Sequence, residues 1–350
     1  MKNQMVYAIV GGAGFLGQHL LHLLLHDPQT EGARIVLMDK APTIEGLTLM
    51  YPEDFLNPSV ACYLNVDIAH NNKLVEMLKG VDVVFHLAAA IAYGRKNKDL
   101  LSRVNTGGIQ KIIESSEAVG VKKIIYVSSC AVLKCLDRKE KIELTSEENS
   151  EKNWDEEKFC YYGRSKYDGE QLVLQATHLE TAVVIPGILL GPGPCHHASI
   201  LPFEIAGKKK WTLVPKGGSN YIDVRDVAEG LVALARQSTI KGQGRYLMVS
   251  HNLEHRELLQ AIAGCFNRTL RFIELPRLLS PFIGYCFSVL EWLLPKKSPY
   301  SKEGALQAFR YRYFSYQKAF DELNWKPSHT LQETLEDTIH WLKKTEAGVQ

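Results

Sequence analysis

The apolar residues in the first half of the chain fall into short continuous runs, each followed by a turn and a longer stretch with helical spacing. Continuous runs are typical of parallel strands covered on both faces, whereas half-exposed strands alternate apolar and polar residues. The runs predict strands over Val6–Val10, Ile35–Met38, Ala61–Leu64, Val81–Leu87, Lys123–Val127 and Thr181–Ile185. The repeated strand–turn–helix order predicts an α/β protein with a doubly wound parallel sheet.

The stretches between these strands place apolar residues on one helical face, as in Phe15–Leu25 and Thr106–Val119. After about Pro186 the pattern becomes less regular, with helices expected over 226–236 and 254–266 and one more strand over Arg245–Val249. We therefore expect a first domain over residues 1–185. A second, mixed region should follow over 186–350, and part of it should rejoin the first sheet.

Composition excludes several classes of protein. Of 350 residues, 45% are hydrophobic and 23% charged, and 41 basic residues nearly cancel 39 acidic ones, so no nucleic-acid-binding surface is expected. None of the seven cysteines lies in a CxxC pair, which argues against a disulfide framework and a zinc knuckle. The chain enters its first strand without a signal-type apolar segment, so we expect a reducing, cytoplasmic location.

A glycine-rich turn follows the first predicted strand directly. Gly11, Gly14 and Gly17 give the spacing GxxGxxG, and Phe15 and Leu16 open the helix between the last two glycines. Glycine is needed where the chain bends sharply, where the backbone approaches a pyrophosphate, and where helix and strand pack closely. The helix N-terminus offers unpaired N–H groups and a favourable dipole to the phosphates. The turn therefore predicts a dinucleotide-binding site.

Residues at the ends of later strands predict how the nucleotide is held. Asp39 closes the second strand, where a carboxylate can accept hydrogen bonds from both adenosine ribose hydroxyls and would repel a 2′-phosphate. NAD is therefore expected in preference to NADP, although the adjacent Lys40 could offset that repulsion. Asp67 and Ile68 could bracket the adenine ring. Leu87 and Ala88 follow the fourth strand, where they are expected to lie beside the cofactor.

Tyr162 and Lys166 lie four residues apart in a segment with helical spacing, so one helix face carries both. A phenol near pKa 10 is a poor base at neutral pH, and a neighbouring ammonium stabilises the phenolate. Ser129 ends the fifth predicted strand at the carboxyl edge of the sheet, where its hydroxyl can polarise a substrate oxygen. These three are the predicted catalytic residues. Asn105 either caps a helix or orders water and backbone near the site.

Together these motifs resemble the extended short-chain dehydrogenases/reductases, the NAD-dependent epimerase/dehydratase superfamily, over nearly the whole chain. The resemblance is strongest to the branch of 3β-hydroxysteroid dehydrogenases and dihydroflavonol reductases. It implies a Rossmann-type fold, with Ser129, Tyr162 and Lys166 as the catalytic residues. Tyr162, Lys166, Asn105 and Pro186 are also expected to lie against bound NAD. The segments 220–228 and 323–327 resemble later signatures of the family.

Two departures from the family pattern affect the expected substrate. Val10 stands where members often have threonine, which leaves phosphate binding possible. Ile185 and Ile188 replace the arginine before Pro186 and the asparagine that sugar-nucleotide epimerases carry, which favours an apolar or ring-shaped alcohol. We expect an NAD-dependent oxidoreductase for a secondary alcohol or ketone. A nucleotide-sugar epimerase/dehydratase with bound NAD, and an NAD-binding regulatory protein without turnover, remain the alternatives.

The most apolar stretch, Leu278–Leu294, is 17 residues long and interrupted by Pro281 and Gly284, so we do not expect it to span a bilayer. It should instead cover an apolar substrate entrance and contact either a membrane surface or a partner subunit, as in a homodimer. His196 and His197 are adjacent on a loop without a carboxylate at ligand spacing, so no metal site is predicted.

Overall fold

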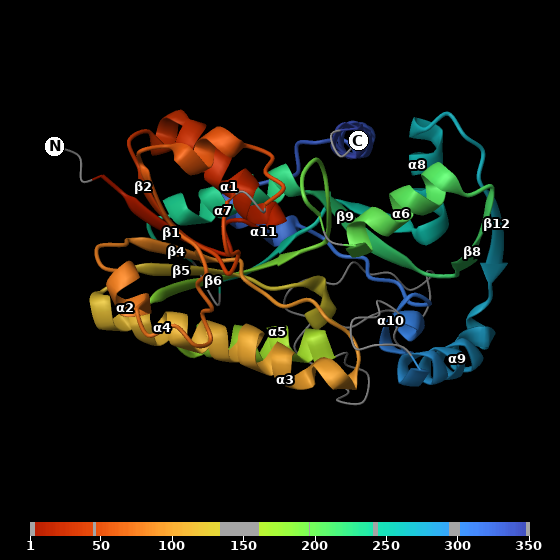
Figure 1. The fold of residues 1–350 in the computed structure, drawn as a ribbon, viewed down its shortest axis with the longest axis horizontal. Coiled ribbons are helices and arrows are strands. Elements are labelled where there is room, and N and C mark those ends of the chain that lie inside the picture. Colours follow the sequence, from red (N-terminus) through yellow and green to blue (C-terminus); the bar gives the residue numbers. More distant parts are fainter. Residues whose placement is uncertain are drawn as a thin grey trace.

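Seven parallel strands form the central layer of the molecule (Figure 1). The structure is a computed structural model that describes residues 4–44, 47–133, 161–195, 197–240, 244–293 and 302–347. In sheet order the strands are β10 (Arg245–Met248), β6 (Glu180–Pro186), β5 (Lys123–Val127), β4 (Val83–His86), β1 (Val6–Val10), β2 (Arg34–Met38) and β3 (Val60–Tyr63). Strands β4 and β5 are buried at every position, which explains why their sequences are mostly apolar without alternation. The predicted Rossmann-type α/β class is confirmed.

Helices cover both faces of this sheet (Figure 1). One face carries α1 (Phe15–His26), α7 (Val224–Arg236) and α11 (Gln317–Leu323), and the other carries α2 (Leu74–Met77), α3 (Lys98–Leu101), α4 (Gly108–Val119) and α5 (Tyr161–Gln175). The helix expected to begin at Thr106 is longer, because a π-helical turn, η4 (Ser102–Gly107), joins α3 to α4. The expectation that Asn105 caps a helix is therefore wrong.

A smaller, mixed region lies beyond the end of β6 (Figure 1). It contains a three-stranded sheet of β11 (His251–Glu254), β9 (Gly218–Asp223) and β7 (Ile188–Leu190), and a parallel pair of β12 (Arg271–Leu275) and β8 (Trp211–Pro215). Its helices are α6 (His197–Lys208), α8 (His255–Cys265), α9 (Ser280–Leu293), α10 (Lys302–Gln307) and α12 (Leu331–Ala347). A separate hydrophobic core forms where α6, α8 and α12 meet this region.

The second half of the chain also contributes to the main sheet. The strand expected over Arg245–Val249 forms as β10, which pairs with β6 in parallel. The division of the chain at residues 185 and 186 stays a prediction. Within the described ranges, no helix is both long and apolar enough to cross a membrane, and Leu294 lies outside those ranges.

The order of the strands determines where a ligand can bind. Strand β1 lies between β2 and β4, so the chain changes direction along the sheet after β3. Because the strands are parallel, the residues that follow β1, β2, β4, β5 and β6 meet at one edge. A crevice at such a switch point is where open α/β sheets bind their ligands.

Candidate active site

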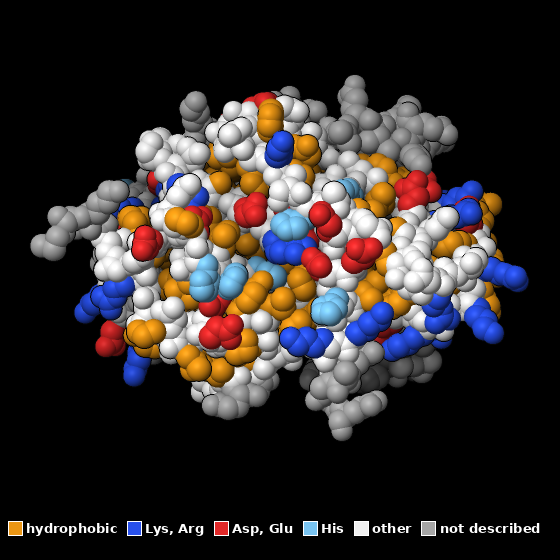
Figure 2. Space-filling view, turned by 90° about the horizontal axis from the view of Figure 1, so that it is seen from above, with side chains coloured by type: hydrophobic (Ala, Val, Ile, Leu, Met, Phe, Trp, Pro, Cys, Tyr) orange, Lys and Arg blue, Asp and Glu red, His pale blue; other side chains and the backbone are white. Residues whose placement is uncertain are grey.

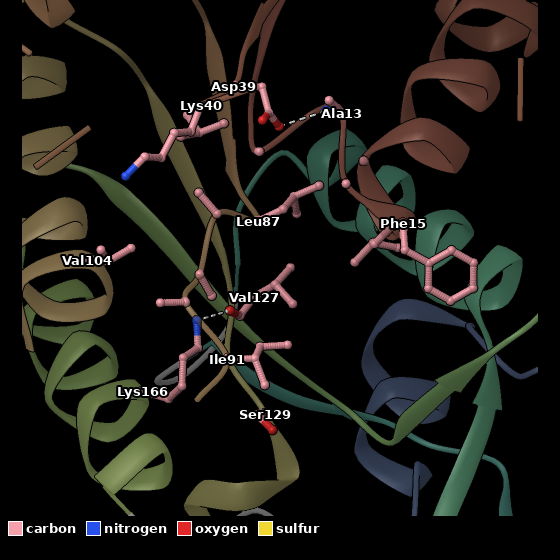
Figure 3. Close-up of a pocket in the computed structure, with 18 of the residues that line it drawn as sticks. Ala13, Phe15, Asp39, Lys40, Leu87, Ile91, Val104, Val127, Ser129 and Lys166 are labelled. Carbon is pink, nitrogen blue, oxygen red and sulfur yellow. Dashed lines mark hydrogen bonds between the residues drawn. The ribbon is translucent and has the colours of Figure 1, made fainter. Parts of the chain in front are cut away.

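A cavity of about 560 Å³ lies at this carboxyl edge (Figure 3). This volume is typical of a small-molecule or cofactor site. Among the residues predicted from the sequence, those that line the cavity are Gly11, Gly14, Phe15, Leu16, Gly17, Asp39, Asp67, Ile68, Leu87, Ala88, Ser129, Tyr162, Lys166 and Pro186. The fold therefore brings the predicted cofactor and catalytic residues into one site, with Asn105 as the exception.

The glycine turn between β1 and α1 has no room for side chains. Gly11 has φ +88°, and a Cβ there would lie 2.7 Å from the backbone nitrogen of Ala88. A Cβ on Gly17 would lie 2.5 Å from the carbonyl oxygen of Gly11, so the turn packs tightly against its own helix. Gly14 is the N-cap of α1, and no side chain caps the helix there. The first N–H groups of α1 can therefore bind an anion such as a pyrophosphate.

Asp39 is fixed at the adjacent strand end. Its Oδ2 accepts a hydrogen bond from the N–H of Ala13 at 2.9 Å, and its Oδ1 accepts one from the N–H of Ala41 at 2.9 Å (Figure 3). The Nζ of Lys40 lies 3.0 Å from Oδ2 of Asp67 instead of turning toward Asp39. Burial is the largest single effect on the pKa of Asp67 and raises it, but the Lys40 ammonium and the N–H of Ala69 together outweigh burial, so the pKa is lowered overall. A carboxylate, and not Lys40, is thus presented where the adenosine ribose of a dinucleotide would lie.

Helix α5 positions Tyr162 and Lys166 beside the end of β5. The Lys166 side chain is 1% exposed; its Nζ donates to the Val127 carbonyl at 2.7 Å (Figure 3) and lies 4.2 Å from the centre of the Tyr126 ring. Burial lowers the pKa of the Lys166 amine to about 7, and the Glu170 carboxylate opposes this shift. The amine can therefore gain or lose a proton near neutral pH, beside the Tyr162 phenol.

The two serines after β5 have different partners. Ser128 donates a short hydrogen bond to the Glu170 carboxylate, which also accepts one from Arg245 at 3.0 Å. Ser129 accepts a hydrogen bond from the N–H of Ala131 at 3.2 Å, which leaves its hydroxyl proton to donate into the cavity (Figure 3). Ser129 is thus the serine placed to polarise a substrate oxygen.

Asn105 does not line the cavity. Its side chain is fully buried in η4, accepts from the N–H of Ala90 at 2.7 Å, and donates to the Ala90 carbonyl at 3.0 Å and to Ser165 Oγ at 2.9 Å. Ala90 does line the cavity. Asn105 is therefore a positioning residue that joins the segment after β4 to α5.

Two residues of the site were missed in the sequence. Glu170 lies four residues after Lys166, so helical spacing alone could have placed it on the same face. Burial raises the pKa of its carboxyl group, the Arg245 guanidinium opposes this shift, and the carboxylate also interacts electrostatically with Lys166. Arg245 comes from β10, and no local signal in the sequence links it to Glu170.

Charge is distributed unevenly along the cavity. The charged residues among its described lining are Asp39, Lys40, Asp67 and Lys166. The other described lining residues are uncharged. Of these, Ala90 packs in one cluster with Tyr162, and the Tyr93 ring centre lies 6.3 Å from that of Tyr162. Ile91 lies between Lys166 and Ser129 (Figure 3). This part of the cavity is suited to an apolar group whose one polar atom meets Ser129 and Tyr162.

Comparison with known proteins extends this picture. The model of the 3-beta hydroxysteroid dehydrogenase/isomerase family matches residues 8–202. The chain is 26% identical over 355 residues to the decarboxylating sterol-4-alpha-carboxylate 3-dehydrogenase of Mus musculus, covering 96% of this chain and 91% of the relative. It is 24% identical over 346 residues to the N-acetyl-alpha-D-glucosaminyl-diphospho-ditrans,octacis-undecaprenol 4-epimerase of Escherichia coli O157:H7, covering 95% of this chain and 94% of that one.

The fold is also found among solved structures. DesIV, a dTDP-glucose 4,6-dehydratase from Streptomyces venezuelae crystallised with NAD and TYD, matches with a TM-score of 0.72 at 17% identity, covering 98% of this chain and 98% of DesIV. At this identity the likeness shows the fold alone. The chain and DesIV therefore share one fold over nearly their whole lengths.

Proposed function

The chain belongs to the 3-beta hydroxysteroid dehydrogenase/isomerase family, within the extended short-chain dehydrogenases/reductases, and we propose that it interconverts a secondary alcohol and a ketone on a largely apolar, ring-bearing small molecule, with NAD as its cofactor. The apolar lining of the cavity around Ser129 and Tyr162 carries this proposal. Ile188 also lines the cavity, at a position where the family resemblance implies asparagine for sugar-nucleotide epimerases.

The residues present fit NAD. The backbone of Gly11, Gly14 and Gly17 would hold the pyrophosphate, since a Cβ at Gly11 or Gly17 would clash with backbone and α1 begins without a capping side chain. Asp39 would accept hydrogen bonds from the adenosine ribose, and Lys166 would donate to the nicotinamide ribose. DesIV, which has the same fold, was crystallised with NAD.

The chain's own residues move the proton. When bound, the cofactor would supply the hydride acceptor for alcohol oxidation, as NAD⁺, and the hydride donor for ketone reduction, as NADH. Tyr162 takes the hydroxyl proton during oxidation and gives it back during reduction. Lys166, in its ammonium form, would stabilise the Tyr162 phenolate, and Ser129 would donate a hydrogen bond to the substrate oxygen. Burial of Tyr162, at 8% exposed, excludes bulk water from this proton transfer.

One experiment separates this proposal from a nucleotide-sugar epimerase, the function favoured by the likeness to the Escherichia coli enzyme. Purified protein is incubated with NAD and a panel of ring alcohols and nucleotide sugars, while NADH is followed by absorbance. We expect net NADH with an apolar ring alcohol and free exchange of NAD on dialysis. Tightly retained NAD, together with an inverted sugar and no net NADH, would contradict the proposal.

We also propose that the apolar substrate reaches the site from an anionic membrane surface. Trp211, Leu213 and Ile273 are 60%, 53% and 54% exposed, and the pairing of β8 with β12 sets them side by side on one face. Leu278 and Phe282, before and within α9, are 89% and 67% exposed. Figure 1 places β8, β12 and α9 at the same end of the molecule.

Basic residues adjoin this apolar surface, and Figure 2 shows Lys and Arg side chains beside hydrophobic ones at that end of the molecule. Lys209 and Lys210 are exposed immediately before Trp211, and Arg271 is exposed directly opposite Trp211 on β12. Lysine and arginine beside exposed aromatic and aliphatic side chains are typical of proteins that bind the headgroup region of anionic bilayers. This combination favours a lipid surface over a second subunit.

Sedimentation with vesicles tests the membrane proposal. We expect binding to vesicles of phosphatidylcholine with phosphatidylserine, release at high salt or in carbonate, and at least about tenfold weaker binding by Leu278→Ser. Leu56→Ser is the matched control, because Leu56 is 75% exposed on η2 (Pro52–Leu56), away from this surface. Protein that stays in the supernatant would refute the proposal, as would retention through carbonate or a dimer abolished by Leu278→Ser.

A further inference from the structure

Two histidines of α1 and one aspartate of η2 form a cluster outside the active site. The Nδ1 of His22 lies 2.8 Å from Oδ2 of Asp54, and the Nε2 of His26 lies 2.9 Å from Oδ1. One ligand atom from each of the three side chains lies within 4.8 Å of the others. The histidines are four apart on one helical turn, the spacing at which two imidazoles can share one ion.

The cluster combines a buried charge with accessible imidazoles. The Asp54 side chain is 3% exposed, whereas those of His22 and His26 are 40% and 55% exposed. A buried carboxylate needs a positive partner to offset its lost hydration. A divalent cation would supply that charge, and the exposed imidazoles leave a path for the ion and for water as a fourth ligand.

We propose that His22, His26 and Asp54 form a Zn²⁺ site that links α1 to η2. Two imidazole nitrogens and one carboxylate oxygen, with an open fourth position, match the ligand preference of this ion. Tetrahedral ligands at about 2.1 Å from zinc lie about 3.4 Å apart. At present the two histidines contact different oxygens of Asp54, at 2.8 and 2.9 Å, and one ligand atom from each residue lies within 4.8 Å of the others, so small side-chain rotations would bring the three atoms to this spacing.

Neighbouring rings hold the His22 imidazole in place. The Tyr51 ring stacks on it, with the ring centres 3.8 Å apart and an angle of 9° between the planes. The Tyr51 hydroxyl lies 3.3 Å from Nδ1 of His19, whose Nε2 lies 2.8 Å from the Pro192 carbonyl. These contacts limit the reorganisation needed to bind an ion, because they orient the imidazole before the ion arrives.

The site would reinforce one wall of the cofactor cavity. Gln18, also on α1, donates to the Thr48 carbonyl at 3.2 Å and accepts from the N–H of Met50 at 2.7 Å. The segment it holds begins at Leu47, which lines the cavity, and continues into η2. An ion between α1 and η2 would fasten the other end of this segment, so its role would be structural and independent of the redox reaction.

Calorimetric titration of the chelator-treated, tag-free full-length protein with ZnCl₂ tests the site. We expect a micromolar or tighter site at one ion per chain, weakened at least about tenfold in His26→Gln. The matched control, His340→Gln, replaces an exposed histidine of α12 and should bind as the wild type does. Zinc should also raise the thermal unfolding midpoint of the wild type and not of His26→Gln.

Several results would overturn the proposal. Absence of binding at a submillimolar zinc concentration would leave a hydrogen-bonded cluster only. Equal affinity in the wild type and His26→Gln would place the ion elsewhere. Since His26 is more than half exposed, its replacement should leave the fold intact, which a circular dichroism spectrum checks, and His22→Gln provides a second variant with the same expectation.

Discussion

Replacing Lys166 with methionine should abolish turnover and yet stabilise the cofactor-free protein. The buried amine has a pKa of about 7, against 10.5 for an ordinary lysine. At 1.36 kcal/mol per pH unit, folding at pH 7 costs roughly 5 kcal/mol through this one group. Methionine has similar length and avoids this cost, but it loses the 2.7 Å hydrogen bond to the Val127 carbonyl, worth about 1–3 kcal/mol. The net gain should be roughly 2–4 kcal/mol.

The pH dependence identifies the cause. In the wild type the pKa of Lys166 in the folded state lies below its unfolded value, so the unfolded chain binds more protons between pH 7 and 10.5. Stability from this group therefore rises with pH across that window. Lys166→Met lacks the effect, and its advantage should be about 3 kcal/mol smaller at pH 9.5 than at pH 7.

Urea unfolding of both proteins at pH 7 and pH 9.5 measures this difference, with Lys79→Met as the control at an exposed lysine. A variant less stable than the wild type at pH 7, or an advantage equal at the two pH values, would refute the reasoning. A more stable variant without turnover would show that the catalytic lysine is retained at the expense of stability.

Two further predictions concern the cofactor and the positioning of the site. NAD should bind at least about tenfold more tightly than NADP in a fluorescence titration. Lys40→Ala should leave the ratio of the two affinities within about twofold, because Lys40 pairs with Asp67. A wild-type ratio near one would show that Lys40, and not Asp39, decides the cofactor preference. Asn105→Ala should lower the free energy of unfolding by about 2–4 kcal/mol and reduce turnover, because it leaves Ala90 without two buried hydrogen bonds. An unchanged free energy of unfolding and unchanged turnover would show that Asn105 does not position the site.

The local features of the sequence predict much of the site. Continuous apolar runs mark the parallel strands because both faces of the sheet are covered. The glycine turn, Asp39 and the spacing of Tyr162 and Lys166 are readable because each depends on a strand end or one helical turn. Such features need no knowledge of distant contacts.

Contacts between distant segments could not be predicted in this way. Glu170 meets Arg245 from β10, and Asp54 meets two histidines of α1, although neither pair shares a local pattern. The spacing of possible ligands along the chain predicted no metal site. The proposed zinc ligands come from two separate elements, α1 and η2, so spacing along the chain could not reveal them. Asn105 was expected either to cap a helix or to order water and backbone near the site. It lies inside a π-helical turn, where its side chain holds the backbone of Ala90.

The most direct test of the proposed chemistry is the rate of NADH formation by the wild type and Tyr162→Phe on the most active apolar ring alcohol. We expect turnover to fall at least about a hundredfold in Tyr162→Phe while the Kd for NAD stays within a few-fold, because only the proton carrier is removed. Undiminished turnover in Tyr162→Phe would contradict the mechanism, as would a wild type that forms no NADH from any apolar alcohol.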